Sequence, residues 1–154
     1  MRRHSIPSYC CDIRHFNFPF VSGPVPAHTA NWPPDIDTSA LAQVFEIDAN
    51  GALINEIVSL YATDSRSGVD AICAMRSDGT LTDVIRLLHT LKSSSGCVGA
   101  ARVVQMAGAF ELRARTDGTV PNAEEIEALA NLVDGACVQL LRLCSERATM
   151  QPEP

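Results

Sequence analysis

The chain has 154 residues, enough for one domain with a hydrophobic core, and aromatic residues make up only 5% of it, which favours helices over sheets. Its net charge is −6, and because residues 1–34 contain three arginines and one aspartate, all of the excess acid lies beyond them. Such an acidic body disfavours binding to a nucleic-acid backbone. No run approaches the roughly 18 apolar residues of a membrane span, and no apolar region follows Met1-Arg2-Arg3 as in a secretory signal. We therefore expect a cytoplasmic protein without membrane or nucleic-acid partners.

Residues 1–34 contain six prolines and no sustained hydrophobic period. A stretch of this kind cannot supply a packed face, so we expect a flexible Pro-rich segment. Its apolar run, residues 16–21, can dock on the rest of the chain or on a partner. Residues 35–148 are expected to form one helical domain, and residues 149–154 a tail.

From Asp35 onward the spacing of apolar residues is helical. Asp37 or Thr38 can cap a short helix that runs to about Phe45. A long helical stretch follows over about 51–76, with a possible kink or break at residues 65–68.

Three further helices are predicted by their end signals. Thr80, with Asp83 three residues on, begins a helix that runs to about Cys97. The next spans about 100–115 and stops at Asp117-Gly118. Asn122, with Glu125 three residues on, caps a last helix that runs to about residue 147. The prediction is an all-α, antiparallel up-down-up-down four-helix bundle with a short N-terminal lid helix.

On a helical wheel of residues 80–98, the core side holds Val84, Leu87, Leu91, Ser94, Ser95 and Val98, with Leu88 at its edge. The opposite side holds Thr82, Arg86, His89, Lys92, Ser93 and Gly96. Ile85 is also expected on the exposed side, one turn before His89. His89 is therefore predicted to face solvent from the middle of a rigid helix.

The neighbours of His89 distinguish it from an ordinary surface histidine. Lys92 lies one turn after it and Arg86 one turn before it, so both cations can approach the imidazole. Lys92 is the only lysine in the chain. Ser93 and Gly96 are small and leave the next turn open. With Ile85 and Arg86, they form a candidate surface for docking a partner.

Six cysteines are present, of which Cys73, Cys97, Cys137 and Cys144 lie in predicted helices and are interpreted as small buried residues in a reducing compartment. In the segment before the helices, the spacing of Cys10, Cys11, His4 and His15 fits no standard zinc pattern. We expect no metal site.

The segment His89-Thr-Leu-Lys92-Ser-Ser-Ser-Gly-Cys-Val-Gly99-Ala100 resembles the phosphotransfer motif of histidine-containing phosphotransfer (HPt) domains, commonly written H-x-L-K-G-S-S-x-x-x-G-A. The resemblance extends over roughly residues 35–147, including a lead-in helix from Asp35 and the stretch Ala109-Phe-Glu111-Leu. It implies a four-helix bundle with His89 as phosphoacceptor and Lys92 as the neighbouring cation. The family usually has glycine where this chain has Ser93, so Ser93 can alter partner docking.

The resemblance implies a phosphorelay intermediate that accepts a phosphoryl group from a receiver-domain aspartate and passes it to another receiver. Response-regulator receivers and a hybrid sensor kinase are the expected partners, and the chain is expected to be a monomer. No Gly-rich phosphate loop or Mg²⁺ carboxylate cluster is evident, so we expect a carrier without an ATP site or cofactor, with Mg²⁺ on the receiver. Two alternatives remain: a receiver-binding adaptor or phosphate sink that does not transfer, and an enzyme with a Ser or Cys nucleophile such as Cys97.

Overall fold

The computed structural model describes residues 35–48 and 50–149, and these residues form helices and no strand. A short 3₁₀ helix, η3 (Thr38–Leu41), leads into α1 (Ala42–Ile47). Four longer helices follow: α2 (Ala52–Asp78), α3 (Leu81–Cys97), α4 (Ala101–Asp117) and α5 (Ala123–Thr149). The predicted all-α class is confirmed, whereas the expectations for residues 1–34 and 150–154 lie outside the described residues.

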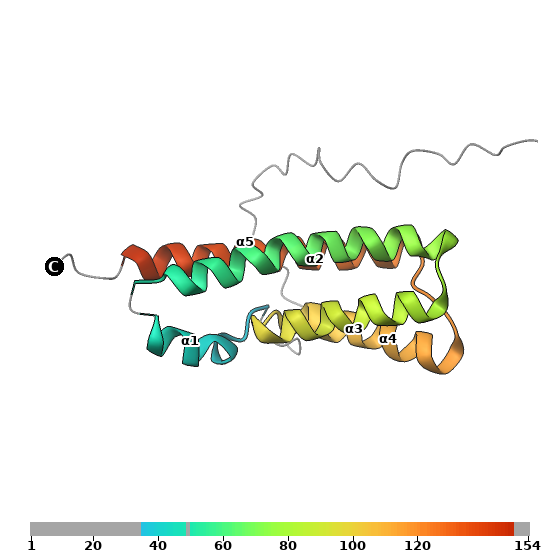
Figure 1. Cartoon of the computed structure of the whole chain (residues 1–154), viewed down its shortest axis with the longest axis horizontal. Helices are drawn as coiled ribbons and strands as arrows, with labels where there is room; N and C mark the ends of the chain where they lie inside the picture. Colours follow the sequence, from blue (N-terminus) through green and yellow to red (C-terminus); the bar gives the residue numbers. More distant parts are fainter. Residues whose placement is uncertain (1–34, 49, 150–154) are drawn as a thin grey trace, which may run out of the picture. The chain divides into compact units, whose positions relative to one another are not determined.

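Each long helix packs against two others. α3 packs most extensively on α4 and α2 on α5, while α2 also contacts α3 and α4 also contacts α5. In Figure 1, α2 lies along α5, and α3 lies along α4. The core between them is formed by fully buried aliphatic side chains from all four helices, among them Ile54, Val58, Leu88, Val103, Leu129 and Leu140.

Capping residues fix several helix ends as the sequence predicts. The Thr80 hydroxyl accepts a hydrogen bond from the Asp83 N–H at 3.2 Å and donates one to the Asp83 carboxylate at 2.7 Å. Asn122 and Glu125 form a reciprocal capping box. The Asn122 N–H donates to the Glu125 carboxylate at 2.8 Å, and the Glu125 N–H donates to the Asn122 side-chain oxygen at 2.9 Å. Gly118 ends α4 in the left-handed region at φ 67°.

Two expectations about helix extent need correction. Asp37 caps the first turn, as predicted, but that turn is the 3₁₀ helix η3, and the α-helix begins only at Ala42. In addition, α2 continues through residues 65–68 without a break. Its Ser65 side chain is buried and lies 4.0 Å from Cys137 Sγ of α5, so packing against α5 keeps this stretch helical.

The corner between α3 and α4 holds the lead-in segment in place. Gly99 has φ 73°, and its carbonyl accepts a hydrogen bond from the Asp37 N–H at 2.7 Å. A Cβ atom on Gly99 would collide with the Asp37 carbonyl, so only glycine fits both this backbone conformation and this close approach. η3 contacts α3, and α1 contacts α2.

By length and mean hydropathy, one described helix is apolar enough to cross a membrane, over Ala123–Glu146 of α5. Its buried residues, including Leu129, Val133 and Leu140, form part of the core shared with the other helices. Acidic residues interrupt the same segment. The apolar residues of α5 are therefore explained by its contribution to the core of the bundle.

Candidate functional site

The imidazole of His89 is exposed on α3 and held by a buried carboxylate on α4. Its side chain is 56% exposed, whereas that of Glu111 is only 5% exposed. His89 Nδ1 lies 3.0 Å from Glu111 Oε1. The side chain expected to face solvent does so, with one ring nitrogen fixed by a residue 22 positions later in the chain.

Glu111 also binds two cations. Lys92 Nζ lies 2.6 Å from Glu111 Oε2. The Arg115 guanidinium, one turn after Glu111 on α4, donates to Glu111 Oε1 at 2.7 and 3.1 Å. Burial raises the pKa of Glu111, but hydrogen bonds from Lys92, Arg115 and His89 outweigh that effect and lower the pKa to about 2. Glu111 is therefore an anion at neutral pH.

The charge on Glu111 determines which tautomer of His89 this site favours. An ionised carboxylate can only accept hydrogen bonds, so the Nδ1 atom must carry the hydrogen. In the neutral imidazole, the lone pair is then on Nε2. This arrangement orients the ring and leaves the lone pair on the nitrogen that does not contact Glu111.

The structure corrects the expected exposure of two neighbours of His89. Lys92 and Ile85 are both half-buried, although the wheel placed them on the solvent side. The side of α3 that carries His89 and Lys92 faces α4, as their contacts with Glu111 show. Leu88, expected at the edge of the core stripe, is fully buried in it.

The remaining predicted site residues surround His89 without joining the Glu111 cluster. Arg86 is 75% exposed and ion-pairs with Asp83 at 3.2 Å. Ser93 and Gly96 are exposed, and a Cβ on Gly96 would come no closer than 3.9 Å to Val104. The small residues therefore do leave an open surface on α3 next to His89.

Gly108 of α4 provides room for Lys92. A Cβ atom added at Gly108 would lie 3.4 Å from Lys92 Cδ, so the aliphatic stem of the lysine runs directly over this glycine. The ammonium thereby reaches Glu111 one turn further along α4. Sequence reasoning gave no role to Gly108, Glu111 or Arg115. The available signals were the resemblance of the stretch containing Glu111 to the family and the four-residue spacing of Glu111 and Arg115.

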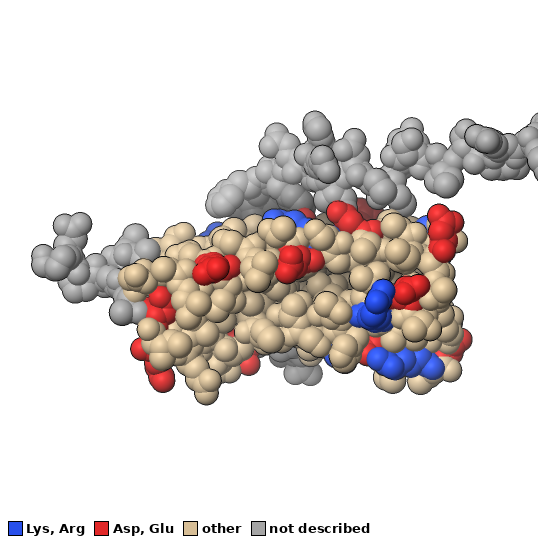
Figure 2. Space-filling model, viewed as in Figure 1, with Lys and Arg blue, Asp and Glu red and all other residues tan. Residues whose placement is uncertain are grey.

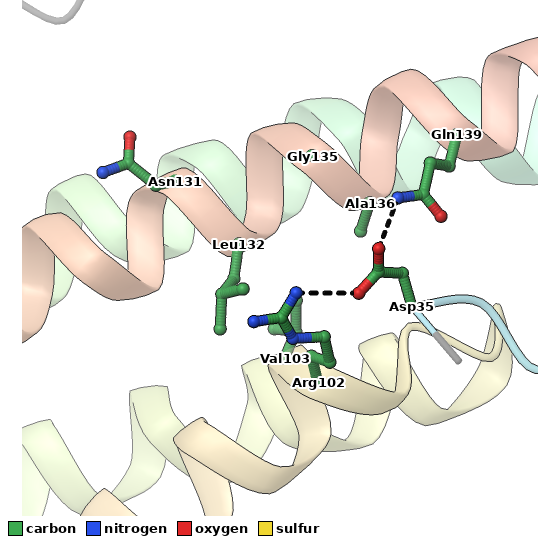
Figure 3. Close-up of a pocket in the computed structure, with 8 residues that line it drawn as sticks. All are labelled: Asp35, Arg102, Val103, Asn131, Leu132, Gly135, Ala136 and Gln139. Carbon is green, nitrogen blue, oxygen red and sulfur yellow. Dashed lines mark hydrogen bonds and ion pairs between the residues drawn. The ribbon is translucent and has the colours of Figure 1, made fainter. Parts of the chain in front are cut away.

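A second polar cluster lies between α4 and α5. Asp35 accepts hydrogen bonds from Arg102 at 2.9 Å and from Gln139 at 2.8 Å, beside a hollow of about 130 Å³ (Figure 3). Gly135 and Ala136 leave this space open, and the Asn131 side chain points away from Asp35. The cluster fastens the lead-in segment to both helices, and the hydrogen bond from Gln139 is the main cause of the lowered pKa of Asp35.

The cysteines in the described part of the chain differ from one another. Cys137 and Cys144 are buried, as expected, and burial raises the pKa of each thiol. Cys73 is half-buried, but Cys97 is exposed at the end of α3, which corrects the expectation that it is buried. Within residues 35–48 and 50–149, no group of three metal-ligating side chains is found. Cys10 and Cys11 lie outside them.

The fold and the Glu111 cluster together define a helical domain that presents one oriented, accessible histidine. The Hpt domain family matches residues 56–142, more than half of the chain, and the chain belongs to this family. Hpt domains are phosphotransfer carriers of two-component signalling that interact with receiver domains and kinases. Neither the curated proteins nor the solved structures include a match to the chain.

Proposed function

We propose that this chain is a phosphorelay intermediate that accepts a phosphoryl group on His89 Nε2 from a receiver-domain aspartate and passes it to a second receiver. The observation that supports this most directly is the hydrogen bond from His89 Nδ1 to the ionised Glu111. It leaves Nε2 with a lone pair on an exposed ring. In this proposal, Mg²⁺ belongs to the receiver, and the phosphoryl group comes from the receiver rather than from ATP bound to this chain.

The proposed transfer step needs only His89 and the partner's aspartyl phosphate as reactants. Nε2 attacks the phosphorus of the partner's aspartyl phosphate, the Nε2–P bond forms, and the P–O bond to aspartate breaks, which releases a carboxylate. The ring keeps its Nδ1 hydrogen and becomes positively charged. Glu111 then pairs with a cationic ring, so its charge stabilises the phosphorylated histidine more than the free one. The reverse reaction delivers the group to the next receiver.

The surface next to His89 would receive these partners. We propose that Ile85, Arg86, Ser93 and Gly96 form the docking surface on α3, with Lys92 beside the phosphoryl group. The four long helices would act as an antiparallel up-down-up-down bundle, with η3 and α1 as an N-terminal lid. The protein would work as a cytoplasmic monomer.

Incubation with a phosphorylated receiver and Mg²⁺ tests the assignment, with the modified residue located by mass spectrometry. Label on His89 that is acid-labile and alkali-stable is the expected result. His89→Gln should abolish it while the thermal melt stays close to wild type, because the ring is exposed. Label that persists in His89→Gln, on His4, His15 or His28, would contradict the proposal.

The second candidate is an adaptor or phosphate sink that binds receivers without passing the group on. Ser93 favours it, because its side chain adds bulk on the exposed surface where the family motif usually has glycine. Under this alternative, the chain would bind the receiver but show no label on His89, or retain the label when a second receiver is added.

A further inference from the structure

The two oxygens of Glu111 are occupied differently. Oε1 accepts from both His89 Nδ1 at 3.0 Å and Arg115 Nη2 at 2.7 Å, whereas Oε2 lies 2.6 Å from Lys92 Nζ. Arg115 therefore shares its oxygen with the imidazole, and Lys92 does not. A change in the charge of the ring therefore acts on the same oxygen that Arg115 binds.

Arg115 is also the more accessible of the two cations on Glu111. Its side chain is 53% exposed, compared with 34% for Lys92. Arg86, the cation expected beside His89 from its position on α3, is directed to Asp83. On the face shown in Figure 2, basic side chains gather over α3 and α4. The second cation of the histidine site is thus supplied by α4.

We infer that Arg115 is a charge-neutralising residue that moves from Glu111 to the phosphoryl group when His89 is phosphorylated. The inference rests on the proposed transfer at His89. When Nε2 forms its bond to phosphorus, the ring becomes a cation and Nδ1–H binds Oε1 more strongly. Arg115 loses part of its attraction to the same oxygen just as a dianionic phosphoryl group arrives nearby.

The chemistry of the guanidinium suits this second position. Its planar array of N–H donors can bind two phosphoryl oxygens at once, which a lysine ammonium does as a point charge only. Lys92 keeps its own oxygen, so Glu111 remains paired and ionised after Arg115 leaves. No bond other than the transferred one is made or broken, and no further reactant is needed.

The test compares Arg115→Gln, which removes the charge but keeps a long polar side chain, with Arg115→Lys, which keeps the charge. Transfer from a phosphorylated receiver is followed over a range of receiver concentrations. We expect Arg115→Gln to lower the maximal rate about tenfold with little change in the half-saturating concentration, and Arg115→Lys to recover most of the rate. Thermal melts of both variants identify a temperature at which each is folded, and the transfer rates are measured at that temperature.

Two control variants separate this role from others. Arg142→Ala removes an exposed charge from α5 and should leave the maximal rate unchanged. Arg86→Ala should raise the half-saturating concentration, as expected for a docking residue. The inference is overturned if the maximal rate of Arg115→Gln is within twofold of wild type. It is also overturned if Arg115→Lys loses as much of the maximal rate as Arg115→Gln. Absence of label in wild type would instead contradict transfer at His89.

Discussion

Glu111 and Asp35 are two carboxylates that each hold an arginine and other donors, yet the structure uses them differently. Glu111 is 5% exposed and its third partner is the imidazole of His89, which keeps a free nitrogen toward solvent. Asp35 is 41% exposed, and Arg102 and Gln139, which hold its carboxylate, are donors that offer no nucleophile. The same kind of polar cluster therefore orients an accessible histidine in one place and fastens a chain segment in the other.

The largest difference between the clusters should appear when their carboxylates are neutralised. Glu111→Gln removes the anion that fixes the His89 tautomer and that, in the proposed transfer, stabilises the cationic ring. We expect transfer to slow roughly 100-fold, since loss of the orienting carboxylate in a Ser-His-Asp triad costs about 10⁴. Single-turnover transfer from a phosphorylated receiver measures this. A rate close to wild type would show that Glu111 has only a structural role.

Glu111 should also leave a signature in stability against pH. Its folded pKa of about 2 lies below the ordinary glutamate value of 4.5, so its contribution to stability is present above about pH 4.5 and is lost as the pH falls toward 2. A shift of this size corresponds to roughly 3 kcal/mol. Denaturant titrations of wild type and Glu111→Gln should therefore converge in stability over this range. Parallel curves would show that the carboxylate is not selectively stabilised in the folded state.

Lys92→Ala tests the cation that holds the other oxygen of Glu111. We expect transfer to slow about tenfold, because the ammonium no longer offsets phosphoryl charge. The half-buried pair with Glu111 also predicts a loss of about 1–2 kcal/mol of stability, more than an exposed lysine would cost. Lys92→Arg should restore the rate only in part. Unchanged transfer with every receiver tested would exclude the electrostatic role.

Asp35→Asn should affect folding but not transfer. Its partly exposed pairs with Arg102 and Gln139 are worth under about 1 kcal/mol. Because the pKa of Asp35 is lowered in the folded chain, this contribution is present above its unfolded pKa and fades as the pH falls through its folded pKa. Thermal melts and transfer assays on the same samples check both parts. Slower transfer would mean that the lead-in segment influences His89.

The smallest effect is expected at Ser93, on the open surface of α3. If the exposed Ser93 side chain hinders a partner's approach, Ser93→Gly removes that obstacle, so we expect transfer to rise by a few-fold at most. The glycine should lower stability by roughly 0.5 kcal/mol through helix propensity. Rates with several receivers measure the effect. A slower rate in all of them would indicate that the Ser93 hydroxyl contributes to docking.

Most helix ends and the central histidine could be predicted from the sequence. The capping signals at Thr80 and Asn122 act within one turn, so neighbouring residues alone specify them. The motif from His89 to Ala100 is also contiguous and indicates the family without a structure. The sequence suggested a kink or break at residues 65–68, but α2 continues through them because this stretch packs against α5. That contact is between distant residues, so the local sequence pattern does not reveal it.

The sequence by itself determined which residue is the phosphoacceptor candidate and which helix presents it. Only the tertiary structure placed Glu111 and Arg115 beside His89. It also packed Lys92 against α4, where the side chain is half-buried, and it paired Arg86 with Asp83. The physical reason is distance along the chain. A hydrogen bond between residues 89 and 111 exists only because α3 and α4 pack together, and that packing is decided by the core of the whole domain rather than by either helix alone.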